Sequence, residues 1–248
     1  MLSGISLYYG RTPENLSQEE LDRYLAEKVQ GKISTFKQLI HGLRYYYRAL
    51  GIKKKLFHLP VIKKGRPLPE ILNADECRRL FHAPSRLRDK VMLCLIYSAG
   101  LRSCELRALR IKDIDSGRML IHIRQSKNHK DRYVPLSEKI LRGLRRYYRE
   151  ESPNDYLFPG GKEGCPLSST TLAQIMRKAV AKAGIRKRIT VHGLRHAYAT
   201  HLLEMGVNIL RVKELMGHTD IRPTMLYLQV MNLSGEKAFS PFDRLYNK

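Results

Sequence analysis

The chain has 248 residues, enough for one or two domains with a buried core, and 43% of these residues are hydrophobic. This composition excludes a disordered chain, and the lack of a long apolar run excludes a membrane-spanning one. The 46 Lys and Arg residues against 23 Asp and Glu give a formal charge of +23, which indicates a polyanionic partner, nucleic acid first.

The start of the chain, MLSGISLYYG, lacks the basic and apolar blocks of a signal peptide. The sequence therefore predicts a cytoplasmic protein that does not associate with a membrane. Its four cysteines form no CxxC pair, so neither a disulfide framework nor a structural zinc site is expected.

Two helices are predicted near the N-terminus. Ser17 and Glu20 have capping-box spacing at the start of the first, residues 17–29. Apolar residues recur at helical spacing in the second, residues 36–50. Two helices bury little apolar surface, so we expect residues 1–51 to be an incomplete or partner-dependent helical module.

Residues 52–70 are predicted to be a linker, because they hold five lysines, an arginine and three prolines without helical periodicity. We expect these cations to lie along phosphates, and a merely solvated basic linker is the alternative. The candidate DNA-binding side chains are Lys53, Lys54, Lys55, Lys63, Lys64 and Arg66.

A second domain is predicted from residue 71, mainly α with a small antiparallel β-sheet. Asn73 and Glu76 form another N-cap pair, and the alternation in residues 119–124 and 132–136 predicts a β-hairpin. The predicted helices of this domain cover residues 73–81, 89–98, 138–150, 168–183, 193–205, 208–216 and 221–229.

Four stretches offer phosphate-binding or proton-handling side chains beside small or apolar residues. They are GLRSCEL (100–106), QSKNHKDRYVPL (125–136), HGLRHAYATHLL (192–203) and LMGHTDIRPTMLY (215–227).

Arg102 follows the end of an apolar helix, and Glu105 lies one helical turn farther on, where it can orient the guanidinium. A plain surface ion pair is the alternative. Arg195 lies three residues after His192, so both side chains share a helix face. Two arginines brought together could hold both nonbridging oxygens of a phosphodiester.

His192 and His196 have the i, i+4 spacing of a zinc pair. No HExxH glutamate lies between them and Arg195 would place a positive charge beside the cation, so no metal is predicted. Taken singly, His196 and His201 are expected to be partly buried, hydrogen-bonded histidines.

Tyr227 lies in a stretch whose periodicity alone favours core packing. The alternative is a nucleophile, because His218 lies nine residues upstream in a chain that also supplies two arginines. A phenol with an ordinary pKa of about 10 needs cationic neighbours and a proton acceptor for that role.

Together these stretches resemble the catalytic domain of the tyrosine recombinase (phage-type integrase) family, most closely its Xer-like and mobile-element members. The resemblance covers residues 71–230, and residues 1–51 are more loosely similar to the family's core-binding domain. Family members usually carry one more helix at the N-terminus, so the resemblance implies that residues 1–51 lack the first helix of that domain. The tail, residues 231–248, corresponds to a region that often docks onto a neighbouring protomer. The family signature is matched in order by Arg102 with Glu105, Lys127, His192 with Arg195, His218 and Tyr227.

The resemblance implies a site-specific recombinase that cleaves and rejoins DNA through a 3′-phosphotyrosyl intermediate without metal, cofactor or ATP. It implies a two-domain clamp on double-stranded DNA, working as a homotetramer on DNA and possible as a free monomer. The resemblance implies that Tyr227 attacks the phosphorus and that Arg102, Arg195 and His218 bind the phosphate. It implies that Lys127 protonates the leaving 5′-oxygen, with Lys130 as the alternative. It also implies that His192 accepts the tyrosine proton and that Glu105 supports Arg102.

Two alternatives stay open from the sequence. One is a type IB topoisomerase-like enzyme that relaxes a single duplex with the same tyrosine. The other is a decayed integrase that still binds DNA without cutting it.

Overall fold

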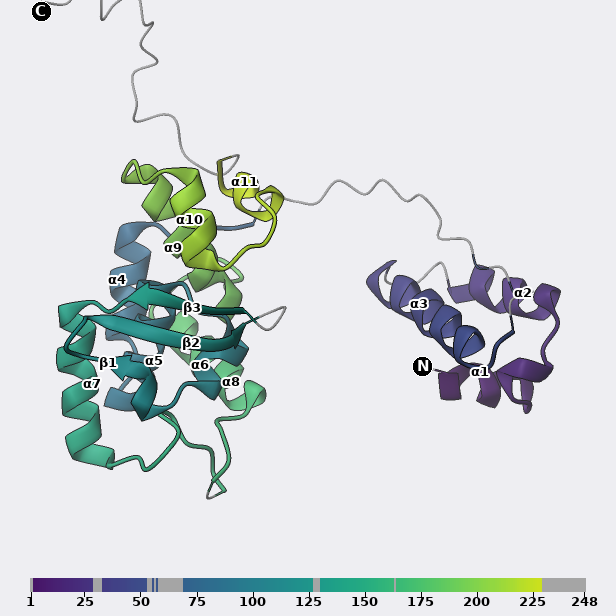
Figure 1. Cartoon of the computed structure of the whole chain (residues 1–248), viewed down its shortest axis with the longest axis horizontal. Coiled ribbons are helices and arrows are strands. Elements are labelled where there is room, and N and C mark those ends of the chain that lie inside the picture. The colour runs from purple at the N-terminus through teal and green to yellow at the C-terminus, as the bar shows by residue number, and fades with distance from the viewer. Residues whose placement is uncertain are drawn as a thin grey trace, which may run out of the picture. The chain divides into compact units, whose positions relative to one another are not determined.

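The computed structural model describes residues 2–28, 33–52, 55, 57, 69–126, 130–162 and 164–228. The chain divides into two compact units, Met1–Arg66 and Pro67–Lys248, which are taken separately below (Figure 1). None of the helices in the described ranges is long and apolar enough to cross a membrane.

The N-terminal unit is helical. Its elements are α1 (Leu2–Tyr9), a 3-10 turn (Pro13–Asn15), α2 (Gln18–Lys28) and α3 (Ile33–Ala49). The predicted capping box is formed at the start of α2, where the Glu20 N–H donates to the Ser17 hydroxyl and the Ser17 N–H donates to the Glu20 carboxylate.

This unit has a larger core than the two predicted helices would form alone. The extra surface comes from α1, from Leu16 in the segment before α2, and from Phe57, which lies in the predicted linker. The ring centroids of Phe57 and Tyr47 are 5.4 Å apart. The buried side chains are Ile5, Leu16, Leu21, Tyr24, Leu25, Phe36, Leu39, Ile40, Leu43, Tyr47 and Phe57.

The second unit is mainly helical with a small antiparallel sheet, as the sequence predicts. Its helices are α4 (Ala74–His82), α5 (Leu87–Ala99), α6 (Ser103–Ala108), α7 (Glu138–Glu151), α8 (Ser169–Lys182), α9 (Val191–Glu204), α10 (Ile209–Met216) and α11 (Arg222–Leu228). Its strands are β1 (Ile114–Asp115), β2 (Leu120–Ser126) and β3 (Lys130–Pro135), with a 3-10 turn (Ile111–Asp113) before β1.

Two elements of this unit were not predicted. Helix α6 has six residues and β1 has two, and such short segments carry no measurable periodicity. The Asn73–Glu76 capping box at the start of α4 was predicted and is formed, with both hydrogen bonds at 2.8 Å.

The sheet has the order β1-β2-β3, with antiparallel neighbours throughout. Ile123 pairs with Arg132 and is 2% exposed, so Arg132 shares the face of the sheet that is turned to the core. On the other face, His122 pairs with Tyr133 and the two rings stack 4.6 Å apart. Register therefore decides that an arginine of β3 points into the protein.

Helices α9, α10 and α11 lie side by side at one end of this unit (Figure 1). They share a small apolar cluster that includes Tyr198, Met216 and Tyr227, and α10 also contacts β3. Helix α5 packs against α9. The C-terminal end of α10 is thereby brought close to β3.

Candidate active site

The site is organised around the carboxylate of Glu105, which is only 6% exposed. Arg102 donates to it from Nη1 (2.7 Å) and from its backbone N–H (2.8 Å). Arg132 donates from Nη1 (2.7 Å) and Nη2 (2.9 Å). Nη1 of Arg195 lies 3.7 Å from the same carboxylate. Three guanidinium groups thus surround one negative charge.

This arrangement keeps Glu105 ionised. Burial alone would raise the pKa of the carboxyl group, but the hydrogen bonds and charge of Arg132, together with those of Arg102, lower it to about 2. With one carboxylate among three guanidinium groups, the cluster retains a net positive charge and can bind an anion.

Arg195 is fully buried, as its 0% exposure shows. Its Nη1 donates to the Gly100 carbonyl, its Nη2 donates to the Met216 carbonyl, and Nη2 also lies 3.3 Å from Nε2 of His218. Its Nε has no hydrogen-bond partner among the described residues. Burial, followed by the charge of Arg102, lowers the pKa of Arg195 to about 10, so the group remains cationic at neutral pH.

Two glycines that end helices supply acceptors for these arginines. Gly100 and Gly217 adopt φ of +60° and +61°, a left-handed conformation that favours glycine. The Gly100 carbonyl accepts from Arg195, and the Gly217 carbonyl accepts from Nη2 of Arg102 at 3.2 Å. A Cβ at position 100 would lie 2.4 Å from the Tyr198 ring. The helix ends therefore help to fix both guanidinium groups.

His218 follows Gly217 and lies between Arg195 and Thr224. Its Nδ1 is 2.8 Å from the Thr224 hydroxyl oxygen, and its Nε2 faces Arg195. Burial, followed by the charges of Arg195 and Arg102, lowers the pKa of His218 to about 4. The imidazole is therefore neutral at pH 7, and Nε2 can accept a hydrogen bond from Arg195 when Nδ1 carries the hydrogen.

Tyr227 in α11 is 3% exposed, and its hydroxyl oxygen lies 3.0 Å from Nδ1 of His196. Burial raises the pKa of Tyr227, while Arg195 and Arg102 act to lower it. Burial, followed by His192 and Arg195, lowers the pKa of His196 to about 4. Nδ1 of the neutral imidazole can therefore accept a hydrogen bond from the phenol. The His192 ring packs on His196 with centroids 4.4 Å apart.

The structure brings together four of the residues singled out from the sequence, and His192 and Tyr227 both contact His196. Arg102, Glu105, Arg195 and His218 are linked by direct contacts. Lys127 lies outside the described residues, as does the side chain of Lys130, whose backbone begins β3.

Two site residues escaped the sequence reasoning. His196 was expected to be a hydrogen-bonded, partly buried histidine, and its partner proves to be the Tyr227 hydroxyl. Arg132 was not singled out, although its alternation with the buried Val134 is a signal that it faces inward. His201 is hydrogen-bonded as expected, to the Tyr97 hydroxyl and the Leu72 carbonyl.

Among the candidate DNA-binding residues, Lys55 is the one whose side chain is described, and it donates to the Leu16 carbonyl at 2.5 Å. The remaining five lie outside the described residues: Lys53, Lys54, Lys63, Lys64 and Arg66. Within the described ranges, no group of three or more His, Cys, Asp or Glu side chains could hold a metal ion.

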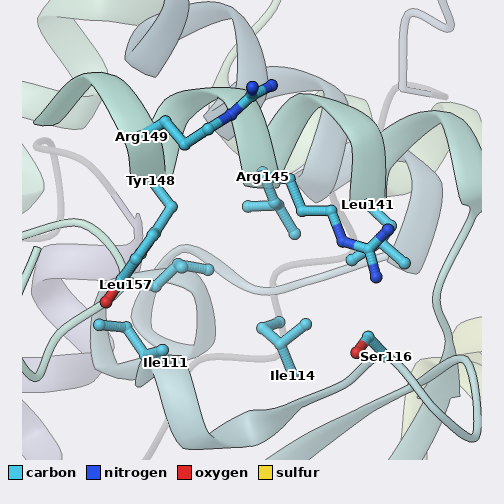
Figure 2. Close-up of a pocket in the computed structure, with 9 residues that line it drawn as sticks. Ile111, Ile114, Ser116, Leu141, Arg145, Tyr148, Arg149 and Leu157 are labelled. Atoms are coloured by element: carbon cyan, nitrogen blue, oxygen red, sulfur yellow. The ribbon is translucent and has the colours of Figure 1, made fainter. Parts of the chain in front are cut away.

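A cavity of about 530 Å³ lies elsewhere, between α7 and the segment that leads into β1. Figure 2 shows the Tyr148 ring extending from α7 toward Leu157 and Ile111. The walls of this cavity are mainly apolar, and none of the residues that line it belongs to the cluster around Glu105. The cavity therefore supplies no group to the site.

Comparison with known proteins gives a consistent result. Residues 70–233 match the phage integrase family. The chain is 34% identical over 244 residues to a putative integrase/recombinase, y4qK, of Sinorhizobium fredii, covering 96% of this chain and 79% of that protein. It is 34% identical over 201 residues to the tyrosine recombinase XerA of Pyrococcus horikoshii, covering 80% of this chain and 70% of that protein.

Solved structures of recombinases share the fold of this chain. A crystal structure of XerA recombinase superposes with a TM-score of 0.62 and 26% identity, covering 96% of this chain and 89% of that one. The XerH site-specific recombinase bound to its difH substrate shares the fold, with a TM-score of 0.73, 23% identity and coverage of 92% of this chain and 72% of that one. The chain therefore belongs to the phage integrase family and is a Xer-like tyrosine recombinase, an enzyme of site-specific DNA recombination.

Proposed function

We propose that this recombinase breaks and rejoins double-stranded DNA through a covalent 3′-phosphotyrosyl intermediate formed by Tyr227. The observation that carries the proposal is that Arg102, Arg195 and His218 converge on one cluster, and that the charges of both arginines act against the rise that burial causes in the pKa of Tyr227. The DNA-bound XerH structure supports DNA as the partner.

In the first step the Tyr227 oxygen attacks the scissile phosphorus, and the bond to the 5′-oxygen breaks. Arg102 and Arg195 hold the nonbridging oxygens, where negative charge increases in the transition state. His218 joins them in the tautomer whose Nε2 carries the hydrogen, with Nδ1 accepting from the Thr224 hydroxyl. The phenol proton passes to an imidazole. His192 is the candidate from sequence, and the contact at 3.0 Å favours His196, on which His192 packs.

The leaving 5′-oxygen takes its electron pair with it and receives a proton from Lys127, with Lys130 as the alternative donor. A lysine beside other cations can have the lowered pKa that this transfer needs. A 5′-hydroxyl of the partner duplex then attacks the phosphotyrosyl bond and releases Tyr227, so the number of phosphodiester bonds is conserved without ATP.

No metal ion takes part in the proposed reaction, since the guanidinium groups supply the positive charge at the phosphate. Cleavage is expected to continue in EDTA, and its loss on chelation would contradict this part of the proposal. We also propose that the basic linker follows phosphates as part of a two-domain clamp and that four chains assemble on two duplexes, because recombination cuts two duplexes in pairs. Native mass measurements with and without DNA test the assembly.

The test of the nucleophile uses a pool of duplexes that covers the DNA flanking the gene, each with a nick near the position of cleavage. Because of the nick, the short end released by cleavage diffuses away, and the covalent adduct is trapped. The wild-type protein should form an adduct with a subset of the pool, and Tyr227→Phe should form none. Tyr97→Phe is the matched control, because Tyr97 also bonds Nδ1 of a histidine, His201, at 2.8 Å.

Adducts formed by Tyr227→Phe would show that another residue is the nucleophile. No adduct from the wild-type protein with any duplex would favour a DNA-binding protein without strand cleavage. Relaxation of a supercoiled plasmid that lacks the selected sequence would instead favour a topoisomerase-like activity.

A further inference from the structure

We infer that Arg132 is a positioning residue: from β3 it holds the carboxylate of Glu105 and thereby sets the direction in which Arg102 meets the phosphate. The inference deepens the proposed function and rests on it. It concerns a residue outside the family signature matched above, on the same hairpin as the two candidate lysines.

The first step of the argument is the sheet register. Arg132 pairs with Ile123, and Val134, two residues on, is fully buried, so the side chain of Arg132 is directed into the protein. Its side chain is 10% exposed. An arginine on a core-facing position is costly unless its hydrogen bonds are satisfied.

Those hydrogen bonds are made, and they leave Arg132 little freedom. Nη1 and Nη2 of Arg132 donate to Oε1 and Oε2 of Glu105, and Nε donates to the Leu215 carbonyl at 3.1 Å. Each of the three nitrogen atoms thus has an acceptor inside the protein. Arg132 is therefore held to Glu105 and to the C-terminal end of α10.

The bidentate grip fixes the plane of the Glu105 carboxylate. Nη1 of Arg102 donates to the same Oε1 that Arg132 holds, and Nη2 of Arg102 reaches the Gly217 carbonyl. With that plane fixed, Arg102 has one orientation that satisfies both bonds. Its side chain is 18% exposed, more than those of Arg132 and Arg195, so it is the guanidinium best able to meet a ligand.

The net charge of the cluster also indicates that Arg132 affects how Arg102 meets the phosphate. Three guanidinium groups around one carboxylate leave a net charge of +2 at the cluster. Without Arg132, Arg102 and Arg195 alone would share the full negative charge of Glu105, and the net charge would fall to +1. Both arginines would then be drawn toward the carboxylate and away from an incoming phosphate.

The same sheet offers a matched control. Arg124 on β2 bonds Asp113 at 2.5 Å, and Asp113 is 3% exposed. Arg124 thus also pairs a strand arginine with a buried carboxylate, but Asp113 belongs to the turn before β1 and not to the cluster around Glu105. The Arg124 side chain is 46% exposed against 10% for Arg132, so a structural role alone predicts a smaller loss of stability for Arg124→Ala. The rates of adduct formation are therefore compared among the folded proteins.

The first test needs no DNA and stands even if the proposed function is wrong. Urea unfolding of Arg132→Ala, Glu105→Gln and the double variant measures the coupling of the pair. We expect the two substitutions to be coupled by roughly tenfold or more in the unfolding equilibrium constant, and Arg124→Ala with Glu105→Gln to be additive. Additivity of Arg132 with Glu105 would overturn the inference.

The second test measures adduct formation on the duplex that the wild-type protein selects. At saturating duplex, Arg132→Ala should lower the rate roughly 10- to 100-fold while changing the duplex affinity less than about threefold, and Arg124→Ala should change neither beyond about threefold. Arg132→Lys should lie between, because an ammonium cannot grip both oxygens. If Arg132→Ala fails to fold, the same comparison is made with Arg132→Lys. Equal rates for the Arg132 and Arg124 variants would overturn the inference.

The third test separates two routes by which Arg132 could act. Replacing the leaving 5′-oxygen of the duplex with sulfur gives a leaving group that needs no proton. The Arg132→Ala defect should persist on this duplex, because it arises at Arg102. Full rescue would show that Arg132 acts through the lysines of the hairpin, and would overturn the proposed route.

Discussion

The hydroxyl oxygen of Tyr227 lies 3.0 Å from Nδ1 of His196, and both groups are largely withdrawn from solvent. A second pair, Tyr97 and His201, has the same atoms at 2.8 Å. The two pairs differ in their surroundings. Burial raises the pKa of both tyrosines, to about 12 at Tyr97, but at Tyr227 the charges of Arg195 and Arg102 act against this rise. Of the two, Tyr227 is the one whose phenolate is favoured by nearby guanidinium groups.

The contact between His196 and Tyr227 leads to a prediction for His196 variants. His196→Ala removes the proton acceptor and should slow adduct formation by roughly 100-fold, the lower end of the range for a general base. His196→Asn keeps a polar atom near Nδ1 without basicity, so it should preserve stability better than it preserves the rate. Single-turnover adduct formation and thermal unfolding measure the two effects, with His201→Asn as the control. A normal rate in His196→Ala would return the role to His192.

Stability should fall as the pH is lowered from about 6.5 to about 4. His196 and His218 have folded pKa values of about 4, below the usual 6.5, so the unfolded chain binds more protons in this window. Each can change the free energy of unfolding by up to about 1.4 kcal/mol per pH unit. Glu105, with a pKa of about 2, loses its contribution only below about 4.5.

Urea unfolding at about pH 7, 6 and 5 checks this prediction. His218→Gln should flatten the dependence of stability on pH, because one buried neutral imidazole is removed. His82→Gln, which changes an exposed imidazole outside the cluster, is the control. An identical slope in all three proteins would contradict the assignment.

Gly217→Ala should be more harmful than its backbone conformation alone requires. At φ of +61° the added Cβ would lie 3.0 Å from Cδ of Arg132, whereas at Gly184, with φ of +64°, no atom lies within 4 Å. Gly184→Ala therefore measures the left-handed strain alone, about 1–2 kcal/mol. The additional loss of stability in Gly217→Ala, read from urea unfolding, reports the displacement of Arg132. Equal losses would mean that Arg132 moves aside freely.

Arg195 and Arg102 should respond differently to replacement by lysine. Arg195→Lys cannot satisfy both the Gly100 and Met216 carbonyls, and one unpaired buried acceptor costs about 1–3 kcal/mol. Arg102 is more exposed, so Arg102→Lys should lower the adduct rate with a smaller loss of stability. Thermal unfolding and adduct rates together check this. Unchanged stability in Arg195→Lys would show that the buried guanidinium does not support the fold.

Local signals in the sequence were sufficient for most elements. The capping pairs at Ser17 and Asn73 formed as predicted, because a cap depends only on residues within one helical turn. Helix α6 and strand β1 were missed because they are too short to carry a period. The core of the N-terminal unit was underestimated because Phe57 contributes from a segment whose composition is that of a linker.

The sequence by itself determined the family and the candidate arginines, histidine and tyrosine, since these residues stand in a fixed order with fixed local spacing. Only the tertiary structure decided which imidazole meets Tyr227 and which arginine holds Glu105. His196 reaches Tyr227 across 31 positions of the chain, and Arg132 reaches Glu105 across 27. Contacts of this kind depend on helix packing and strand register, which no local pattern of residues specifies.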